Sequence, residues 1–216
     1  MIKQQNKHLL NPKKQERRAE TFTKAILVTG TPGAGKTTIA HKLASKLNAN
    51  YLCITDLVKK KQLFTSEDKE RNTLIADTAE VEKHLQKILA NTAATTVIDG
   101  HYAVDVAPKK QVEMVFVLRR DPRQLKTVLE TRGYDTKKVW ENLTAEILDV
   151  CLWDAMSVYG SDKVCEIDVS NKTIDEVVEE VTHVLEKRKD CRQGTVDWLK
   201  KLETDGQLEE FLKKMG

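Results

Sequence analysis

The amino-acid sequence predicts an α/β fold in which a mostly parallel sheet carries helices on both of its faces. Short apolar, β-branched runs alternate along the chain with segments whose apolar residues recur at helical spacing. The first of these runs, Ala25–Thr29, leads through a glycine-rich loop into a helical pattern that ends near Leu47. At 216 residues, the chain is long enough to form one domain with a substantial core.

The remaining elements follow in the same alternating order. Further strands are expected at Tyr51–Ile54, Thr95–Asp99, Val112–Leu118 and Lys163–Ile167. Helices are expected to begin near Asp56 and at the capping positions Asp77, Asp121 and Thr173. One long helix is predicted from Thr136 to Ala155, and the polar stretch Gln62–Asn72 is expected to be mobile.

The two ends of the chain differ in composition from this core, which we expect to span residues 25–190. Residues 1–24 carry seven lysines and arginines against two glutamates and no convincing period, which predicts a flexible basic arm. Such an arm either holds RNA phosphates electrostatically or is simply a solvated tail. Residues 191–216 form a C-terminal helical extension, for which packing on the core is favoured over an exposed docking face.

The glycine-rich loop has the pattern of a phosphate-binding P-loop. Residues 30–37 read G-T-P-G-A-G-K-T, which matches G-x-x-x-x-G-K-[ST] between a strand and a helix. Gly33 and Gly35 let backbone N–H groups turn toward phosphate oxygens at a helix N-terminus. Lys36 is expected to reach the β- and γ-phosphates of ATP, and the Thr37 hydroxyl to hold Mg²⁺. The alternative, a glycine-rich turn without a ligand, is disfavoured by the flanking strand and helix.

Two polar residues follow the strand at Thr95–Asp99. Asp99 ends this strand, as an acidic Mg²⁺ partner of a P-loop does, although a lone aspartate before a glycine also caps turns. His101 comes two residues later and could orient or deprotonate an attacking water or hydroxyl near neutral pH. A structural histidine is the alternative at this position.

Two arginines are placed to stabilise the charge of a transferring phosphoryl group. Arg119 ends the strand at Val112–Leu118, and Arg132 precedes Gly133 between two predicted helices. Planar guanidinium groups suit the equatorial phosphate oxygens, whereas the alternative for each residue is an ordinary surface arginine. The segment around Arg132 could close over ATP as a small lid.

Several other classes of protein are disfavoured. A guanine-specific switch needs N-K-x-D at the end of a strand, but in Asn171–Asp175 the aspartate comes one residue too late, at a helix start. No apolar run reaches membrane-spanning length, and the basic N-terminus lacks the apolar stretch of a signal peptide. The four cysteines have no C-x-x-C spacing, which favours a reduced, cytoplasmic protein over a zinc or disulfide framework.

Four motifs together resemble one family. They are residues 30–38, the D-x-H pattern within residues 97–102, V-L-R-x-D at residues 117–121 and E-T-R-G-Y at residues 130–134. This combination resembles the atypical adenylate kinases of the isoenzyme 6 type, also called coilin-interacting nuclear ATPases, and their archaeal counterparts. Residues 141–142 and 145–147 also look like that family. The P-loop is generic, whereas the D-x-H pair together with T-R-G-Y is specific, and the match covers residues 25–190.

The resemblance implies a nucleoside-monophosphate-kinase fold and assigns roles to matching residues. ATP would be bound by Gly33, Gly35, Lys36, Thr37, Thr38 and Arg132. Mg²⁺ would be held by Thr37 and by Asp99, the latter directly or through water. Lys36, Asp99, His101 and Arg132 would be the catalytic residues. The monophosphate-binding segment would span about residues 53–76 and the lid about residues 131–141.

The acceptor side is assigned to Asp56, Lys59 and Arg119. Lys59 stands where some relatives have arginine, and a lysine cannot bind a phosphate bidentately, which bears on monophosphate affinity. Arg120 also departs from the family pattern, because a small polar residue is expected after Arg119.

We therefore expect an ATP-dependent nucleoside monophosphate kinase that converts ATP and AMP to two ADP and also has ATPase activity. The resemblance further implies a role in maturing the small ribosomal subunit, with a small-subunit ribosomal protein and pre-ribosomal rRNA as partners. Two alternatives stay open: a ribosome-assembly ATPase whose kinase activity is incidental, and a kinase of another small metabolite.

Overall fold

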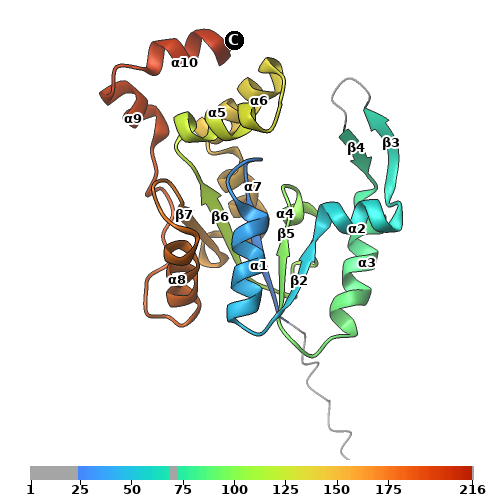
Figure 1. Cartoon of the computed structure of the whole chain (residues 1–216). Coiled ribbons are helices and arrows are strands. Elements are labelled where there is room, and N and C mark those ends of the chain that lie inside the picture. Colours follow the sequence, from blue (N-terminus) through green and yellow to red (C-terminus); the bar gives the residue numbers. More distant parts are fainter. Residues whose placement is uncertain (1–23, 69–72, 216) are drawn as a thin grey trace, which may run out of the picture.

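The computed structural model describes residues 24–68 and 73–215, and its centre is a five-stranded parallel sheet (Figure 1). The strands lie side by side in the order β2, β5, β1, β6, β7. Their bounds are Ala25–Gly30 for β1, Asn50–Cys53 for β2, Thr96–Asp99 for β5, Val112–Arg119 for β6 and Val164–Asp168 for β7. All four pairings are parallel, which confirms the predicted fold class. Except for Lys24, the predicted basic arm lies outside the described residues.

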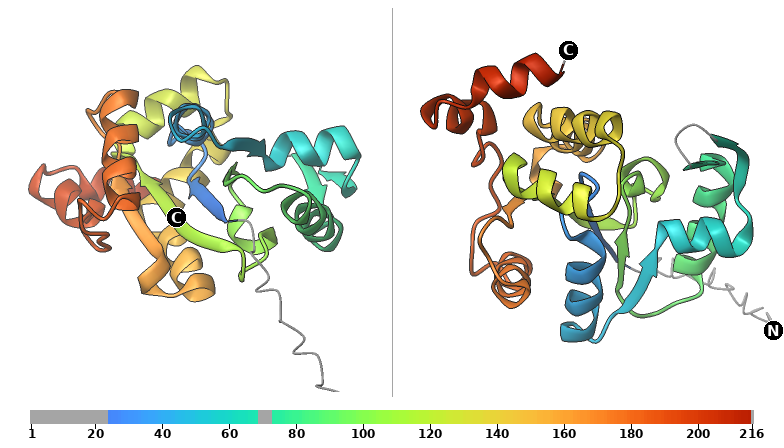
Figure 2. Two further views of the ribbon diagram at one scale, coloured as in Figure 1. Left: turned by 90° about the horizontal axis from the view of Figure 1, so that it is seen from below. Right: turned by 45° about the horizontal axis from the view of Figure 1, so that its top comes forward.

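Helices cover both faces of the sheet (Figures 1 and 2). One face carries α3 (Thr78–Ala90), α4 (Ala103–Val106) and α7 (Val150–Tyr159), and the other carries α1 (Lys36–Lys46) and α8 (Ile174–Leu185). Side chains alternate between the two faces of a strand, so Leu27 packs in the first layer while Ile26 and Val28 pack in the second. Burial on both faces explains why β1 is apolar without interruption.

A third hydrophobic cluster lies beyond the carboxyl ends of the strands. It is built by α5 (Pro122–Thr131), α6 (Thr136–Ile147), α9 (Trp198–Thr204) and α10 (Leu208–Met215), which Figure 1 shows together at the top. Trp198, Leu202 and Phe211 of the extension are buried against α5 and α6. The expectation that the C-terminal helices pack on the core is therefore confirmed.

Three predicted helix starts are confirmed by their capping contacts. The side chain of Asp77 accepts a hydrogen bond of 3.1 Å from the backbone N–H of Glu80 at the start of α3. Asp121 caps α5 in the same way, with proline at the first helical position. Thr173 and Glu176 form a reciprocal capping box at α8. None of the helices in the described ranges is long and apolar enough to cross a membrane.

Part of the stretch predicted to be mobile, Gln62–Asn72, forms a strand that pairs with the residues after it, while residues 69–72 lie outside the described residues. After α2 (Ile54–Lys61), β3 (Phe64–Asp68) pairs antiparallel with β4 (Thr73–Ala76). The described residues of β3 are almost all exposed, and β3 is held to β4 by antiparallel backbone pairing. A strand without a buried face lacks the alternating apolar pattern by which strands are recognised in a sequence.

The single helix predicted from Thr136 to Ala155 is wrong, because the chain forms α6 and α7 there. The break lies at Asp149, whose backbone φ of 57° is left-handed and cannot continue a right-handed helix. Aspartate tolerates this conformation better than most residues, and its carboxylate forms an ion pair with Arg119. After α7, a short 3₁₀ turn at Ser161–Lys163 leads into β7.

Candidate active site

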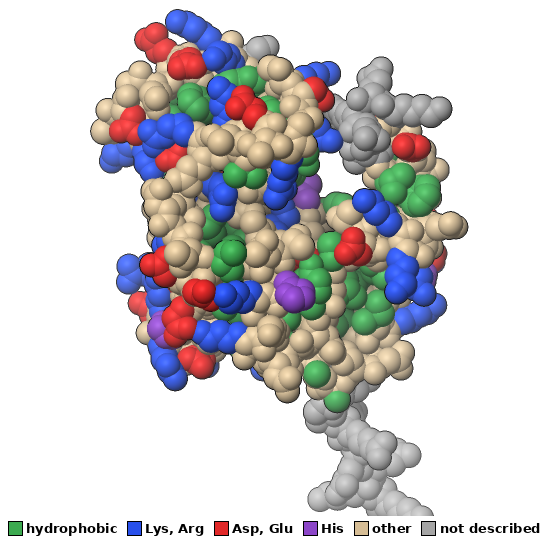
Figure 3. Space-filling view, viewed as in Figure 1, with side chains coloured by type: hydrophobic (Ala, Val, Ile, Leu, Met, Phe, Trp, Pro, Cys, Tyr) green, Lys and Arg blue, Asp and Glu red, His purple; other side chains and the backbone are tan. Residues whose placement is uncertain are grey.

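A pocket with a volume of about 390 Å³ opens at the carboxyl ends of β1, β2 and β5. Ligands of parallel α/β sheets bind at this edge. The predicted residues that line it are Gly33, Gly35, Lys36, Thr37, Thr38, Asp56, Asp99, His101 and Arg132. Figure 3 shows lysine and arginine side chains gathered at the hollow between the α5–α6 pair and α1. Most of the predicted site residues are thus brought together.

The P-loop has the backbone of an anion cradle. Gly33 and Gly35 have φ values of 92° and 97°, which L side chains rarely adopt. A Cβ on Gly33 would also lie only 2.8 Å from Cδ1 of Leu125, so the loop packs closely on α5. Gly35 is the N-cap of α1, and the first N–H groups of that helix therefore face the pocket without helical partners. These features fit a nucleotide's phosphates.

The side chain of Lys36 is held by hydrogen bonds to the backbone at the start of the P-loop. Its Nζ donates hydrogen bonds of 2.8 Å to the carbonyl of Gly30 and 3.1 Å to the carbonyl of Thr31. Burial lowers the pKa of Lys36 to about 8, against the opposing effect of Asp99 and other acidic groups. At neutral pH the ammonium group is therefore still mostly protonated and supplies a positive charge beside the cradle.

Asp99 and Thr37 form an oxygen pair suited to Mg²⁺. The Thr37 hydroxyl donates a hydrogen bond of 2.7 Å to Oδ2 of Asp99, whose side chain is buried. The hydroxyl of Tyr51, on β2, donates a bond of 2.8 Å to the other carboxylate oxygen. Burial and this hydrogen bond raise the pKa of Tyr51, so it stays a donor. Hydroxyl and carboxylate oxygens are ligands that Mg²⁺ prefers, and the pair fits such an ion.

Tyr51 was not predicted as a site residue. It lies on β2, which runs parallel to β5 with Cys53 opposite Asp99, so its side chain extends toward the same carboxylate. The sequence alone does not show that β2 pairs with β5, and this pairing is what brings Tyr51 to Asp99. A tyrosine two residues before the end of a strand carries no signal on its own.

His101 lines the pocket from the turn after β5. Its backbone carbonyl accepts a hydrogen bond of 3.2 Å from Thr29, and its Nδ1 lies 4.0 Å from Sγ of Cys151. Although the residue as a whole is exposed, burial of its ring and then the charge of Lys36 lower the pKa of the imidazole. A neutral imidazole at this place could accept a hydrogen bond from a water or hydroxyl.

The residues predicted for the lid and for the acceptor side do not all line the pocket. Arg132 is the C-cap of α5 and lines the pocket together with Tyr134, on the short connection to α6. Asp56, in the first turn of α2, also lines it. Lys59 lies exposed in the last turn of α2 and is not among the described residues that form the lining.

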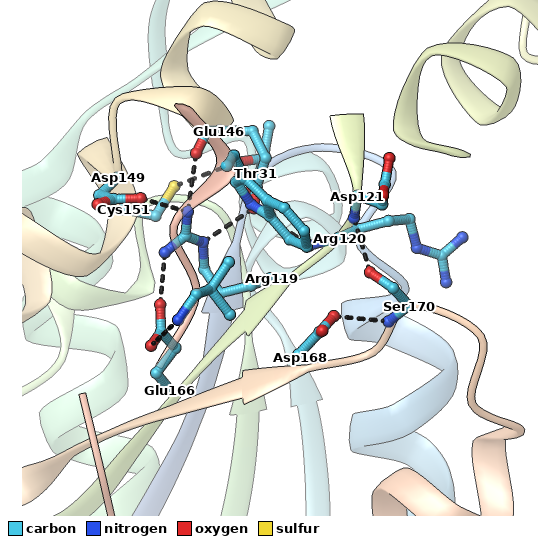
Figure 4. A network of polar contacts seen from close by, with 12 residues as sticks. Thr31, Arg119, Arg120, Asp121, Glu146, Asp149, Cys151, Glu166, Asp168 and Ser170 are labelled. Carbon is cyan, nitrogen blue, oxygen red and sulfur yellow. Dashed lines mark hydrogen bonds and ion pairs between the residues drawn. The ribbon is translucent and has the colours of Figure 1, made fainter. Parts of the chain in front are cut away.

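The assignment of Arg119 to the acceptor is wrong, because its side chain is only 1% exposed and points into the interior (Figure 4). Its Nε donates a hydrogen bond of 2.8 Å to Glu146, and its other nitrogens pair with Asp149 and Glu166. Burial would lower the pKa of Arg119, but these carboxylates outweigh it and raise that pKa. With its donors used inside the protein, Arg119 is a structural residue.

Glu146 is the residue that joins this interior cluster to the pocket. Its Oε2 accepts a hydrogen bond of 2.6 Å from the hydroxyl of Thr31 in the P-loop. Its Oε1 accepts bonds from Arg119 and, at 2.9 Å, from the indole N–H of Trp198 on α9. The sequence marked Glu146 only through the family resemblance, because the partners of its carboxylate come from three distant segments.

The chain is also similar to known proteins. A family model described as "AAA domain" matches residues 26–149. A protein from Methanocaldococcus jannaschii named "Putative adenylate kinase" is 39% identical over 176 residues, which cover 82% of this chain and 93% of that protein. A protein of the same name from Pyrococcus abyssi is 37% identical over 174 residues, covering 80% of this chain and 90% of that protein.

The fold also resembles that of solved kinases. The shikimate kinase from Acinetobacter baumannii, solved with shikimate bound, matches with a TM-score of 0.54 at 17% identity, over 79% of this chain and 96% of that chain. A match at this identity shows a shared P-loop kinase fold. The chain accordingly belongs to the AAA domain family and to the adenylate-kinase-like family of its archaeal relatives.

Proposed function

We propose that this protein transfers the γ-phosphoryl group of ATP to a nucleoside monophosphate, with AMP as the acceptor. The single observation that carries the proposal is the meeting of the Lys36 ammonium and the Thr37–Asp99 oxygen pair in one pocket. The adenylate-kinase-like relatives support the choice of reaction class.

The chain's own residues would divide the work as follows. The P-loop N–H groups and Lys36 bind the phosphate chain, and Thr37 with Asp99 would hold Mg²⁺. When bound, Mg²⁺ neutralises charge that develops on the phosphate oxygens. Arg132 supplies a further positive charge from the lid side of the pocket. His101 orients the acceptor, or a water molecule when no acceptor is bound, and the second case accounts for slow ATPase activity.

ATP turnover measured with and without each nucleoside monophosphate tests this proposal. We expect AMP to stimulate ATP turnover strongly, with ATP and AMP both converted to ADP. If no monophosphate stimulates ATP turnover and the only products are ADP and inorganic phosphate, the protein is an ATPase and the kinase proposal is contradicted. Stimulation by a different small hydroxyl or phosphate compound would instead favour a metabolite kinase.

We also propose a second role, in assembly of the small ribosomal subunit. It is supported by the resemblance to the isoenzyme 6 type and by the seven lysines and arginines against two glutamates in residues 1–24. The expected partners are a small-subunit ribosomal protein and pre-ribosomal rRNA. Pull-down experiments should then capture such a protein in a manner that depends on ATP. Capture that is indifferent to ATP and ADP argues against this role.

A further inference from the structure

Arg120 directs its side chain toward the P-loop. It follows β6, and its backbone N–H donates a hydrogen bond of 3.1 Å to Oε1 of Glu146, which fixes the chain at this point. Figure 4 shows its side chain pointing away from the cluster around Arg119. Its Nη2 lies 3.7 Å from the position that a Cβ would take on Gly35, the N-cap of α1. The guanidinium therefore lies beside Gly35, which lines the pocket, although Arg120 itself is not among the described residues of that lining.

This guanidinium has no direct partner among the described residues, although the charge of Glu146 acts on it from nearby. Within the described ranges, no side chain or carbonyl forms a hydrogen bond or ion pair with it, and its Nε is buried without a partner. The arginines on either side differ, because Arg119 pairs with three carboxylates and Arg123 pairs with Asp121 and Asp205.

A second cation, Arg132, also lies near Arg120. Burial and then the charge of Arg132 lower the pKa of Arg120, against the opposing charge of Glu146. A partly buried cation beside a second cation and a helix N-terminus is unfavourable unless an anion joins them. The phosphate chain of a nucleotide is an anion of the right kind, since a planar guanidinium can donate two parallel hydrogen bonds to phosphate oxygens.

We propose that Arg120 binds the phosphate chain of the donor nucleotide from the α1 side, as a third cation beside Lys36 and Arg132. This inference rests on the proposed function only in that the P-loop must bind a nucleotide; it does not depend on the acceptor. It gives a role to a residue that departs from the pattern of the family.

Binding of ATP and of inorganic tripolyphosphate, each measured by isothermal titration calorimetry, tests the proposal. Arg120→Ala should weaken both ligands about tenfold, because one charge-assisted contact is lost. Arg120→Lys should recover part of the affinity, since it restores the charge without the planar fork. Lys126→Ala, which removes a positive charge from the next helix, is the matched control and should change neither Kd.

Steady-state kinetics add a second readout. In Arg120→Ala, KM for ATP should rise while KM for AMP stays as in the wild type. If Arg120→Ala binds tripolyphosphate as tightly as the wild type does, the proposal is overturned. If the same variant nevertheless binds ATP more weakly, Arg120 contacts the base of the nucleotide and not its phosphates. A thermal unfolding curve for each variant shows that it is folded. A wild-type protein that binds both ligands but phosphorylates no monophosphate would contradict the kinase function while leaving this inference intact.

Discussion

Thr31 of the P-loop and Glu146 of α6 are joined by a hydrogen bond of 2.6 Å that spans 115 positions of the chain. Both residues are buried, and the same carboxylate also binds the indole of Trp198. The P-loop, α6 and the C-terminal extension are therefore held together by one side chain. Its second oxygen balances part of the charge of Arg119.

Replacing Glu146 by glutamine should destabilise the fold strongly. The amide keeps the shape but removes a negative charge from the buried Arg119 cluster, and breaking such a cluster costs about 3 kcal/mol in the free energy of unfolding. Urea unfolding measures the loss. Glu209→Gln, on the exposed surface of α10, is the control and should change stability by less than about 0.5 kcal/mol. A Glu146→Gln protein as stable as the wild type would show that the cluster is not needed.

Replacing Tyr51 by phenylalanine should weaken the use of Mg²⁺. The ring can still pack against His41, but Asp99 loses one of the two hydroxyls that orient it. Removing a group that orients a metal ligand typically lowers the affinity for the metal tenfold or more. We expect the Mg²⁺ concentration for half-maximal ATP turnover to rise about tenfold.

Tyr159→Phe is the control for this experiment. It removes a hydroxyl that donates to the carbonyls of Val104 and Ala107 in the layer of α3, α4 and α7, outside the pocket lining. Its Mg²⁺ dependence should match the wild type. If Tyr51→Phe also matches it, the phenol does not support the metal site.

Asp121 should make stability depend on pH in the acid range. Burial would raise the pKa of this carboxyl, but hydrogen bonds from Arg123 and Lys201 outweigh it and lower the pKa below the ordinary value of 3.8. The unfolded chain then binds the proton more readily than the folded chain. The stabilisation is thus fully present above about pH 5 and is lost as the pH falls through the lowered pKa.

Urea unfolding of Asp121→Asn from pH 7 to pH 3 measures this effect. The variant should be about 2 kcal/mol less stable at pH 7, and the gap should narrow below pH 4. Asp190→Asn removes an exposed carboxylate and should show a small gap at every pH. A gap for Asp121→Asn that stays constant down to pH 3 would contradict the assignment.

Much of the fold could be predicted because its signals are local. Ala25–Gly30 is buried on both faces and reads as a strand, and the capping residues of α3, α5 and α8 lie within three positions of their partners. The β3–β4 hairpin was missed because the described side chains of β3 are almost all exposed. The break at Asp149 was missed because the partner of its carboxylate, Arg119, lies 30 residues away.

The same distinction explains the candidate site. Lys36, Thr37 and Asp99 belong to motifs whose spacing carries the chemistry. The alternation of side chains between the two faces of β6 could have corrected the assignment of Arg119. Val115 and Val117 face the layer of α7, while Phe116 and Leu118 face α1. Continued by two residues, the pattern turns Arg119 toward α7 and Arg120 toward the P-loop side.

AMP phosphorylation by the Lys36→Ala variant tests the central claim most directly. With ATP, AMP and Mg²⁺, the wild-type protein should form two ADP for each ATP consumed, and Lys36→Ala should lower kcat/KM about 100-fold or more. Lys46→Ala, at the other end of α1, removes the same charge from an ion pair with Glu179 and should keep full activity. Undiminished AMP phosphorylation by Lys36→Ala would contradict phosphoryl transfer at this P-loop.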